Sequence, residues 1–153
     1  MADTKLIDKL NDILKHEWTG VAQYAHYSFV LPGTVREVYA PKFYESAEES
    51  FEHAKRVAEK ISAMGGVPSV ERNAVQLTTD FGEMLEHSLA FEQKAVEEYT
   101  AALALSDGVD RALTVLLEDL LIQEQDGVDE LTLILREHAP AAIESAGDVK
   151  KLG

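Results

Sequence analysis

Apolar residues recur every three or four positions in four separate stretches of the chain, which is the spacing of amphipathic helices. The four stretches cover approximately residues 4–31, 41–64, 80–106 and 110–138. Each is followed by residues that end helices, namely Pro32-Gly33, Gly65-Gly66, Asp107-Gly108 and Pro140. No competing strand pattern is present. The sequence therefore predicts an all-α protein with four helices.

The connections between these helices differ in length. Residues 67–78 show no sustained periodicity, and either Thr79 or Asp80 could cap the helix that follows them. The other two connections are short, and helix two is expected to begin near Pro41, which suits a first turn. Two hairpins joined by a long segment form a four-helix bundle with one long crossover between helices two and three. We expect a single domain over residues 1–153, with the core bundle at about 4–138 and a short C-terminal tail at 139–153.

The charge of the chain bears on its partners. It has 28 acidic and 14 basic residues, which give a formal net charge of -14. This charge repels phosphate backbones and attracts cations, so nucleic acid is not an expected partner and divalent metal ions are. No stretch approaches the ~18 consecutive apolar residues that a bilayer requires, and the N-terminal residues lack the apolar core of a secretory signal. We therefore expect a cytoplasmic protein with no membrane partner.

Three of the helical stretches carry a glutamate in the middle of the apolar stripe, and these are Glu17, Glu92 and Glu124. On the remaining helix, His53 lies at the edge of the stripe. A buried carboxylate without a partner is costly, and one bound cation would satisfy several of them. Carboxylate oxygens and imidazole nitrogens on rigid helices suit iron or manganese. Coincidence is the alternative in so acidic a chain, but three central glutamates favour a metal site.

These residues and their neighbours resemble the bacterioferritins of the ferritin-like superfamily over about residues 6–137. The resemblance rests on Glu17 with Gln23-Tyr24, on His53-Ala54 with Gly66-Val67-Pro68, on Glu92, and on Glu124 with Val128-Asp129. It implies a ferritin-like bundle in which Glu17 and His53 are terminal ligands of one iron. Glu92 would be a terminal ligand of a second iron, and Glu124 would bridge the two. The resemblance also implies a symmetric homo-oligomer, such as a cage.

Two positions depart from the family's pattern. Ser50 stands where a second bridging glutamate is expected, and Gly127 where a second histidine is expected. Glu49 is the alternative candidate for the missing bridge, although it is turned ~100° from Ser50 around the helix. A mononuclear or incomplete di-iron site would follow, with ferroxidase activity weakened or absent, so the assignment as an enzyme stays open. Haem is not expected, because Phe51 stands where haem-binding members have methionine.

Other residues leave alternatives open. Tyr24 follows Glu17, and Tyr99 follows Glu92, by about two helical turns, so either tyrosine could hydrogen-bond a ligand or relay an electron, although core packing is the preferred interpretation. Gly127 costs ~1 kcal/mol inside a helix, which indicates either close helix packing or space for water or an exogenous ligand. The remaining histidines are expected in surface or interface positions: His16, His26, His87 and His138.

The leading hypothesis is an iron-binding ferritin-like protein for iron storage or detoxification. One alternative is a structural or partner-binding bundle whose metal site has decayed. Another is a DNA-protecting mini-ferritin, which has a similar Gly-Gly-x-Pro segment but a metal site between subunits. The acidic composition and the lack of a basic arm disfavour this last alternative.

Overall fold

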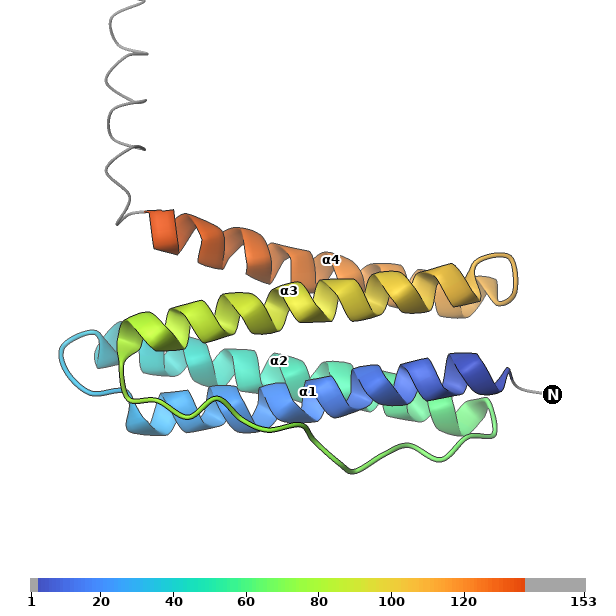
Figure 1. The fold of residues 1–153 in the computed structure, drawn as a ribbon, viewed down its shortest axis with the longest axis horizontal. Helices are drawn as coiled ribbons and strands as arrows, with labels where there is room; N and C mark the ends of the chain where they lie inside the picture. The colour runs from blue at the N-terminus through green and yellow to red at the C-terminus, as the bar shows by residue number, and fades with distance from the viewer. Residues whose placement is uncertain (1–2, 137–153) are drawn as a thin grey trace, which may run out of the picture.

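Four helices make up the regular structure of residues 3–136, which are the residues that the computed structural model describes (Figure 1). Their bounds are α1 Thr4–Val30, α2 Arg36–Ala63, α3 Phe81–Ser106 and α4 Arg111–Arg136. No strand occurs in this range, so the prediction of an all-α fold is confirmed. None of these helices combines the length and the apolar character that would let it cross a lipid bilayer.

Aspartate begins three of the four helices. The Asp3 side chain accepts a hydrogen bond from the backbone N–H of Lys5, and Asp80 accepts one from Glu83 at 2.9 Å. Asp110 does the same for α4 through Leu113. These carboxylates satisfy N–H groups that have no partner within the first turn of a helix, and Asp80, rather than Thr79, is the cap of α3. The predicted end of α4 at 138 and the tail at 139–153 lie outside the described residues.

The predicted start of helix two was wrong. The helix begins at Arg36 and not near Pro41, which lies inside its second turn. Pro41 has no N–H to donate to the carbonyl group four residues earlier in the helix. Because Pro41 is exposed, water can bond that carbonyl group instead. Arg36 strengthens the early start, because its guanidinium donates hydrogen bonds to the carbonyl oxygens of Ser28, Phe29 and Leu31 at the end of α1. One side chain thus joins the end of α1 to the start of α2.

The long crossover lies between α2 and α3 and runs along α1 for most of the bundle (Figure 1). Side chains of α1 hold its backbone in place. Trp18 donates to the carbonyl oxygen of Ser69, and Thr19 accepts from the backbone N–H of Asn73. Gln23 accepts from the N–H of Gln76 at 3.0 Å. The crossover has no helical structure of its own, and these hydrogen bonds to α1 side chains hold it against the bundle.

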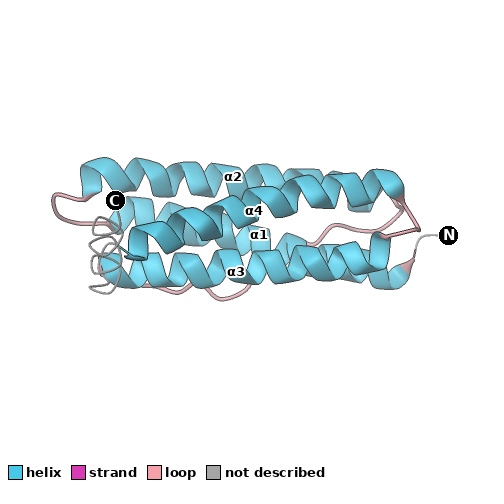
Figure 2. Cartoon of the chain, turned by 90° about the horizontal axis from the view of Figure 1, so that it is seen from above, coloured by secondary structure: helices cyan, strands magenta, loops and turns pink. Residues whose placement is uncertain are grey.

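The four helices run along a common direction (Figure 2). The interior contains two apolar clusters, one toward each end of the bundle. The first includes Leu10, Leu14 and Leu117, and the second is rich in aromatic residues such as Tyr27 and Phe43. Glu17 comes after the last α1 residue of the first cluster and before the first α1 residue of the second. Glu17, His53 and Glu124 therefore form a buried polar layer near the middle of the bundle.

Candidate metal centre

Three of the four predicted ligands come together in this polar layer. Glu17 of α1, His53 of α2 and Glu124 of α4 each offer one ligand atom, and the three atoms lie within 4.8 Å of one another. Their exposed fractions are 0%, 2% and 3% respectively. No other group of this kind occurs within residues 3–136. Three helices therefore bring two carboxylates and one imidazole to one buried point.

Both ring nitrogens of His53 make hydrogen bonds at this point. Its Nδ1 lies 2.8 Å from Oε1 of Glu124 and 3.6 Å from Oε1 of Glu17. Its Nε2 donates to Oε1 of Gln123 at 2.9 Å. Because Gln123 fixes Nε2 as a donor, the Nδ1 atom is the one that faces both carboxylates and is placed to ligate a metal.

Only one of the two carboxylate oxygens of Glu17 has a hydrogen-bond partner among the described residues. Its Oε1 accepts a hydrogen bond from the Tyr99 hydroxyl at 2.9 Å. Its Oε2 is buried and has no hydrogen-bond partner among the described residues. A buried carboxylate oxygen without a donor is destabilising, and a cation beside it removes the penalty. The donor set of carboxylate oxygen and imidazole nitrogen fits iron, manganese or zinc.

The charges of the three groups are strongly linked. Burial lowers the pKa of His53, but hydrogen bonds and charge interactions with Glu124 and Glu17 outweigh it and raise that pKa to about 11. Burial and the charge of Glu17 raise the pKa of Glu124 to about 7, against the opposing hydrogen bonds from Glu92 and His53. His53 is therefore an imidazolium at neutral pH when no metal is bound.

Glu92, the fourth predicted ligand, lies next to this trio without being part of it. Its Oε1 accepts a hydrogen bond from Tyr24 at 2.6 Å, and its side chain is partly exposed. Burial, followed by its interaction with Glu124, raises the pKa of Glu92 well above its usual range. Its carboxylate rests on the backbone of α4 at Gly127. Glu92 is therefore held by Tyr24 beside the trio.

The two departures from the expected pattern have different surroundings. A Cβ placed on Gly127 would lie 3.2 Å from Cδ of Glu92, so the glycine makes room for that carboxylate. The atoms nearest to this Cβ all belong to the Glu92 side chain and not to the backbone of another helix, and Gly127 also lines an open pocket. Close helix packing therefore does not describe this position, whereas space beside the glycine, the second interpretation, is present. Ser50 packs against α1, where a Cβ on Gly20 would lie only 2.5 Å from its Oγ. α1 and α2 therefore approach each other too closely at Ser50 for a large side chain to point toward α1.

Glu49, the alternative candidate for the bridging ligand, lies on the opposite side of the His53 imidazole from Glu17 and Glu124. Its Oε1 is 3.6 Å from Nε2 of His53, whereas Nδ1 faces Glu17 and Glu124. Its side chain is 52% exposed. The structure thus does not bring Glu49 to the point where the other three residues meet.

Sequence reasoning foresaw some of these contacts and missed others. Tyr24 and Tyr99 pack in the core, which was the preferred interpretation, and each also hydrogen-bonds a glutamate, which was the alternative left open. The sequence carried no signal for the contact between Gln123 and His53, because Gln123 is not a position of the apolar stripe and only precedes Glu124. His16 was expected on the surface or at an interface, but it is buried and stacks on Phe91 with ring centroids 3.9 Å apart.

The comparisons with known proteins agree with this fold. Residues 7–139 match the family model of the ferritin-like domain. A crystal structure of a ferritin-like, diiron-carboxylate protein from Bacillus anthracis strain Ames is 30% identical to this chain. The match covers 86% of this chain and 95% of that one, with a TM-score of 0.83. The chain is therefore a member of the ferritin family, built on the ferritin-like domain.

Proposed function

We propose that this chain is an iron-binding ferritin-like protein that stores or detoxifies iron, and that Glu17, His53 and Glu124 hold the metal. The observation that carries the proposal is the buried trio itself, in which Oε2 of Glu17 has no hydrogen-bond partner among residues 3–136. A bound cation would satisfy this oxygen and replace the proton on Nδ1 of His53. Similarity to the diiron-carboxylate protein of B. anthracis supports iron as the metal.

We infer a mononuclear or incomplete di-iron site. Glu92 stands apart from the trio, and neither Ser50 nor Gly127 supplies the expected further ligand. Bound iron would supply one-electron chemistry between its ferrous and ferric states. The protein side chains would bind the ion, exclude bulk water and fix the Nε2 proton of His53 on Gln123. Ferroxidase activity would be weak or absent, because a two-iron reaction needs both metals held close together.

The proposal also includes the bacterioferritin type within the family and a symmetric homo-oligomer such as a cage. The support is the pattern of residues around Glu17, His53 and Glu124. A DNA-protecting mini-ferritin fits less well, since its metal site lies between subunits whereas these three residues meet inside one bundle. The net charge of -14 also opposes binding to DNA.

One observation favours the alternative of a structural bundle with a decayed site. The imidazolium of His53 already neutralises charge on Glu17 and Glu124, so the bundle can hold these groups without a metal. In that case Fe(II), Mn(II) and Zn(II) would all leave the unfolding temperature unchanged. A ligand that binds only the native state must raise that temperature.

The test is anaerobic titration of metal-free protein with Fe(II), followed by metal analysis and a measurement of solution mass. We expect saturable binding that is weakened at least ~10-fold by Glu124→Ala and unchanged by Glu118→Ala, a substitution at an exposed position of the same helix. Fe(II) oxidation measured against the uncatalysed rate would show whether ferroxidase activity remains. Equal Fe(II) binding by wild type and Glu124→Ala would refute the proposed ligands.

A further inference from the structure

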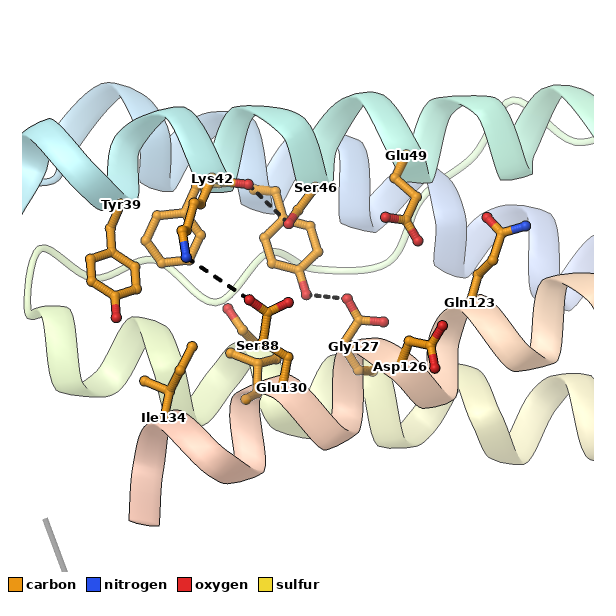
Figure 3. A pocket seen from close by; sticks show the side chains of 14 residues that line it. Tyr39, Lys42, Ser46, Glu49, Ser88, Gln123, Asp126, Gly127, Glu130 and Ile134 are labelled. Atoms are coloured by element: carbon orange, nitrogen blue, oxygen red, sulfur yellow. Dashed lines mark hydrogen bonds and ion pairs between the residues drawn. The ribbon is translucent and has the colours of Figure 1, made fainter. Parts of the chain in front are cut away.

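An open pocket of about 270 Å³ lies between α2 and α4 (Figure 3). It adjoins the candidate metal centre, because Gln123, which lines it, is hydrogen-bonded to His53. Part of its lining is apolar or aromatic, from Tyr39, Phe43, Leu131 and Ile134. Four carboxylates also face it, from Glu49, Glu92, Asp126 and Glu130. The pocket therefore combines an apolar wall with a concentration of negative charge.

Two of these four carboxylates have no cationic partner among the described residues. Lys42 pairs with Glu130 at 3.9 Å, and Glu49 lies 3.6 Å from Nε2 of His53. Glu92 and Asp126 have no ion pair with any residue in the described part of the chain. Carboxylates that line one pocket repel one another, and a cation between them would relieve the repulsion.

Lys42 shows how an ammonium group fits at the pocket mouth. Its Nζ lies 5.5 Å from the centre of the Tyr39 ring while it pairs with Glu130 (Figure 3). An aromatic face and a carboxylate together favour an alkylammonium ion. The Lys42 side chain is half exposed, so it covers the mouth and leaves the inner end beside Glu92 to another group.

The inner end suits an ammonium ion better than a second metal. A transition metal needs several ligands at fixed positions, and the imidazole that the family would supply is absent because residue 127 is glycine. A primary ammonium has three donors and tolerates varied geometry. We propose that this pocket binds a small organic cation, a primary ammonium compound with an apolar body. Its ammonium group lies among Glu49, Glu92 and Asp126, and its body lies against Phe43, Leu131 and Ile134.

Calorimetry with metal-free protein tests this proposal, with 2-phenylethylamine as the probe and 2-phenylethanol as its uncharged counterpart. We expect saturable binding of the amine, at least ~10-fold tighter than binding of the alcohol, because hydrogen bonds to charged groups are the stronger ones. Glu92→Gln should weaken amine binding at least ~10-fold. Glu17→Gln should weaken Fe(II) binding and leave amine binding unchanged, so this site and the metal centre are tested separately.

A lysine placed in the pocket wall gives a second test. Ser46 lines the pocket on α2, and Ser46→Lys would put an ammonium group of the protein itself among the carboxylates. Amine binding should then be lost, whereas Ser62→Lys, at an exposed position of the same helix outside the pocket, should leave it unchanged. The proposal is overturned by no saturable amine binding, by equal affinity for the alcohol, or by equal effects of the two lysine substitutions.

Discussion

Tyr99 of α3 donates a hydrogen bond of 2.9 Å to Glu17 of α1, across the middle of the bundle. The reverse pair also exists, since Tyr24 of α1 donates to Glu92 of α3 at 2.6 Å. In each helix the tyrosine follows the glutamate by seven residues, or about two turns, which keeps both on one face. Two equal spacings on neighbouring helices thus produce two reciprocal contacts, and each fixes one carboxylate with a phenol from the opposite helix.

Tyr99→Phe should lower the free energy of unfolding of the metal-free protein by ~1–3 kcal/mol, as expected when a buried carboxylate loses a donor. Oε2 of Glu17 already has no partner among the described residues, so this substitution leaves the whole carboxylate without a neutral donor. Urea denaturation measures the change. The control is Tyr44→Phe on exposed α2 surface, which should have little effect. Equal stability of Tyr99→Phe and wild type would mean that this hydrogen bond does not stabilise the fold.

Gly20→Ala should also destabilise the protein, through steric crowding where α1 meets its neighbours. The new Cβ would lie 2.5 Å from Oγ of Ser50 and 2.6 Å from Cζ of Phe91. Overpacking of this kind costs ~1–3 kcal/mol, which exceeds the ~1 kcal/mol that alanine gains over glycine in a helix. Thermal or urea unfolding tests the sign. Adding Ser50→Ala should recover part of the loss, whereas a more stable Gly20→Ala protein would contradict the close packing.

The parts of this structure that sequence could predict depend on local patterns. Helix periodicity and aspartate caps such as Asp80 gave the four helices, and the stripe positions of Glu17 and Glu124 placed them inside the bundle. Pro41 misled the prediction of α2, because its missing hydrogen bond costs little where it faces water. The position of Glu92 depends on Tyr24 and on the space above Gly127, which are contacts between helices. Periodicity within one helix contains no information about such contacts.

Gly127→His should increase the number of metal ions that each chain retains from about one to about two. The introduced imidazole would lie beside Glu92 and Glu124, and i, i+3 spacing after a glutamate is the arrangement that di-metal bundles use. Glu92 must shift by a few tenths of an ångström to admit the new Cβ, against the hydrogen bond that Tyr24 donates to its Oε1. Metal analysis after gel filtration measures the ratio. Gly127→Phe has similar bulk but no ligand atom, and it should not raise metal retention; an equal increase in both variants would exclude ligation as the cause.

The affinity for a divalent metal should rise with pH between about 6 and 8. The metal-free site holds a proton on His53 throughout this range, since its pKa is raised to about 11 by Glu124 and Glu17, in spite of desolvation. Metal binding at Nδ1 must displace that proton. Glu124 has a pKa of about 7, so it is mostly protonated at pH 6 and must then release a second proton. At pH 8 it is mostly ionised.

Proton release on metal binding should therefore fall from about two protons at pH 6 to about one at pH 8. Calorimetric titration with Zn(II), in two buffers of different ionisation enthalpy, counts the protons without interference from iron oxidation. His53→Gln has no imidazole proton to lose, so its release should be smaller by about one at both pH values, together with weaker binding. Release that does not change between pH 6 and pH 8 would show that Glu124 does not titrate in this range. Zero release at pH 8 would show that the metal does not replace the proton of His53.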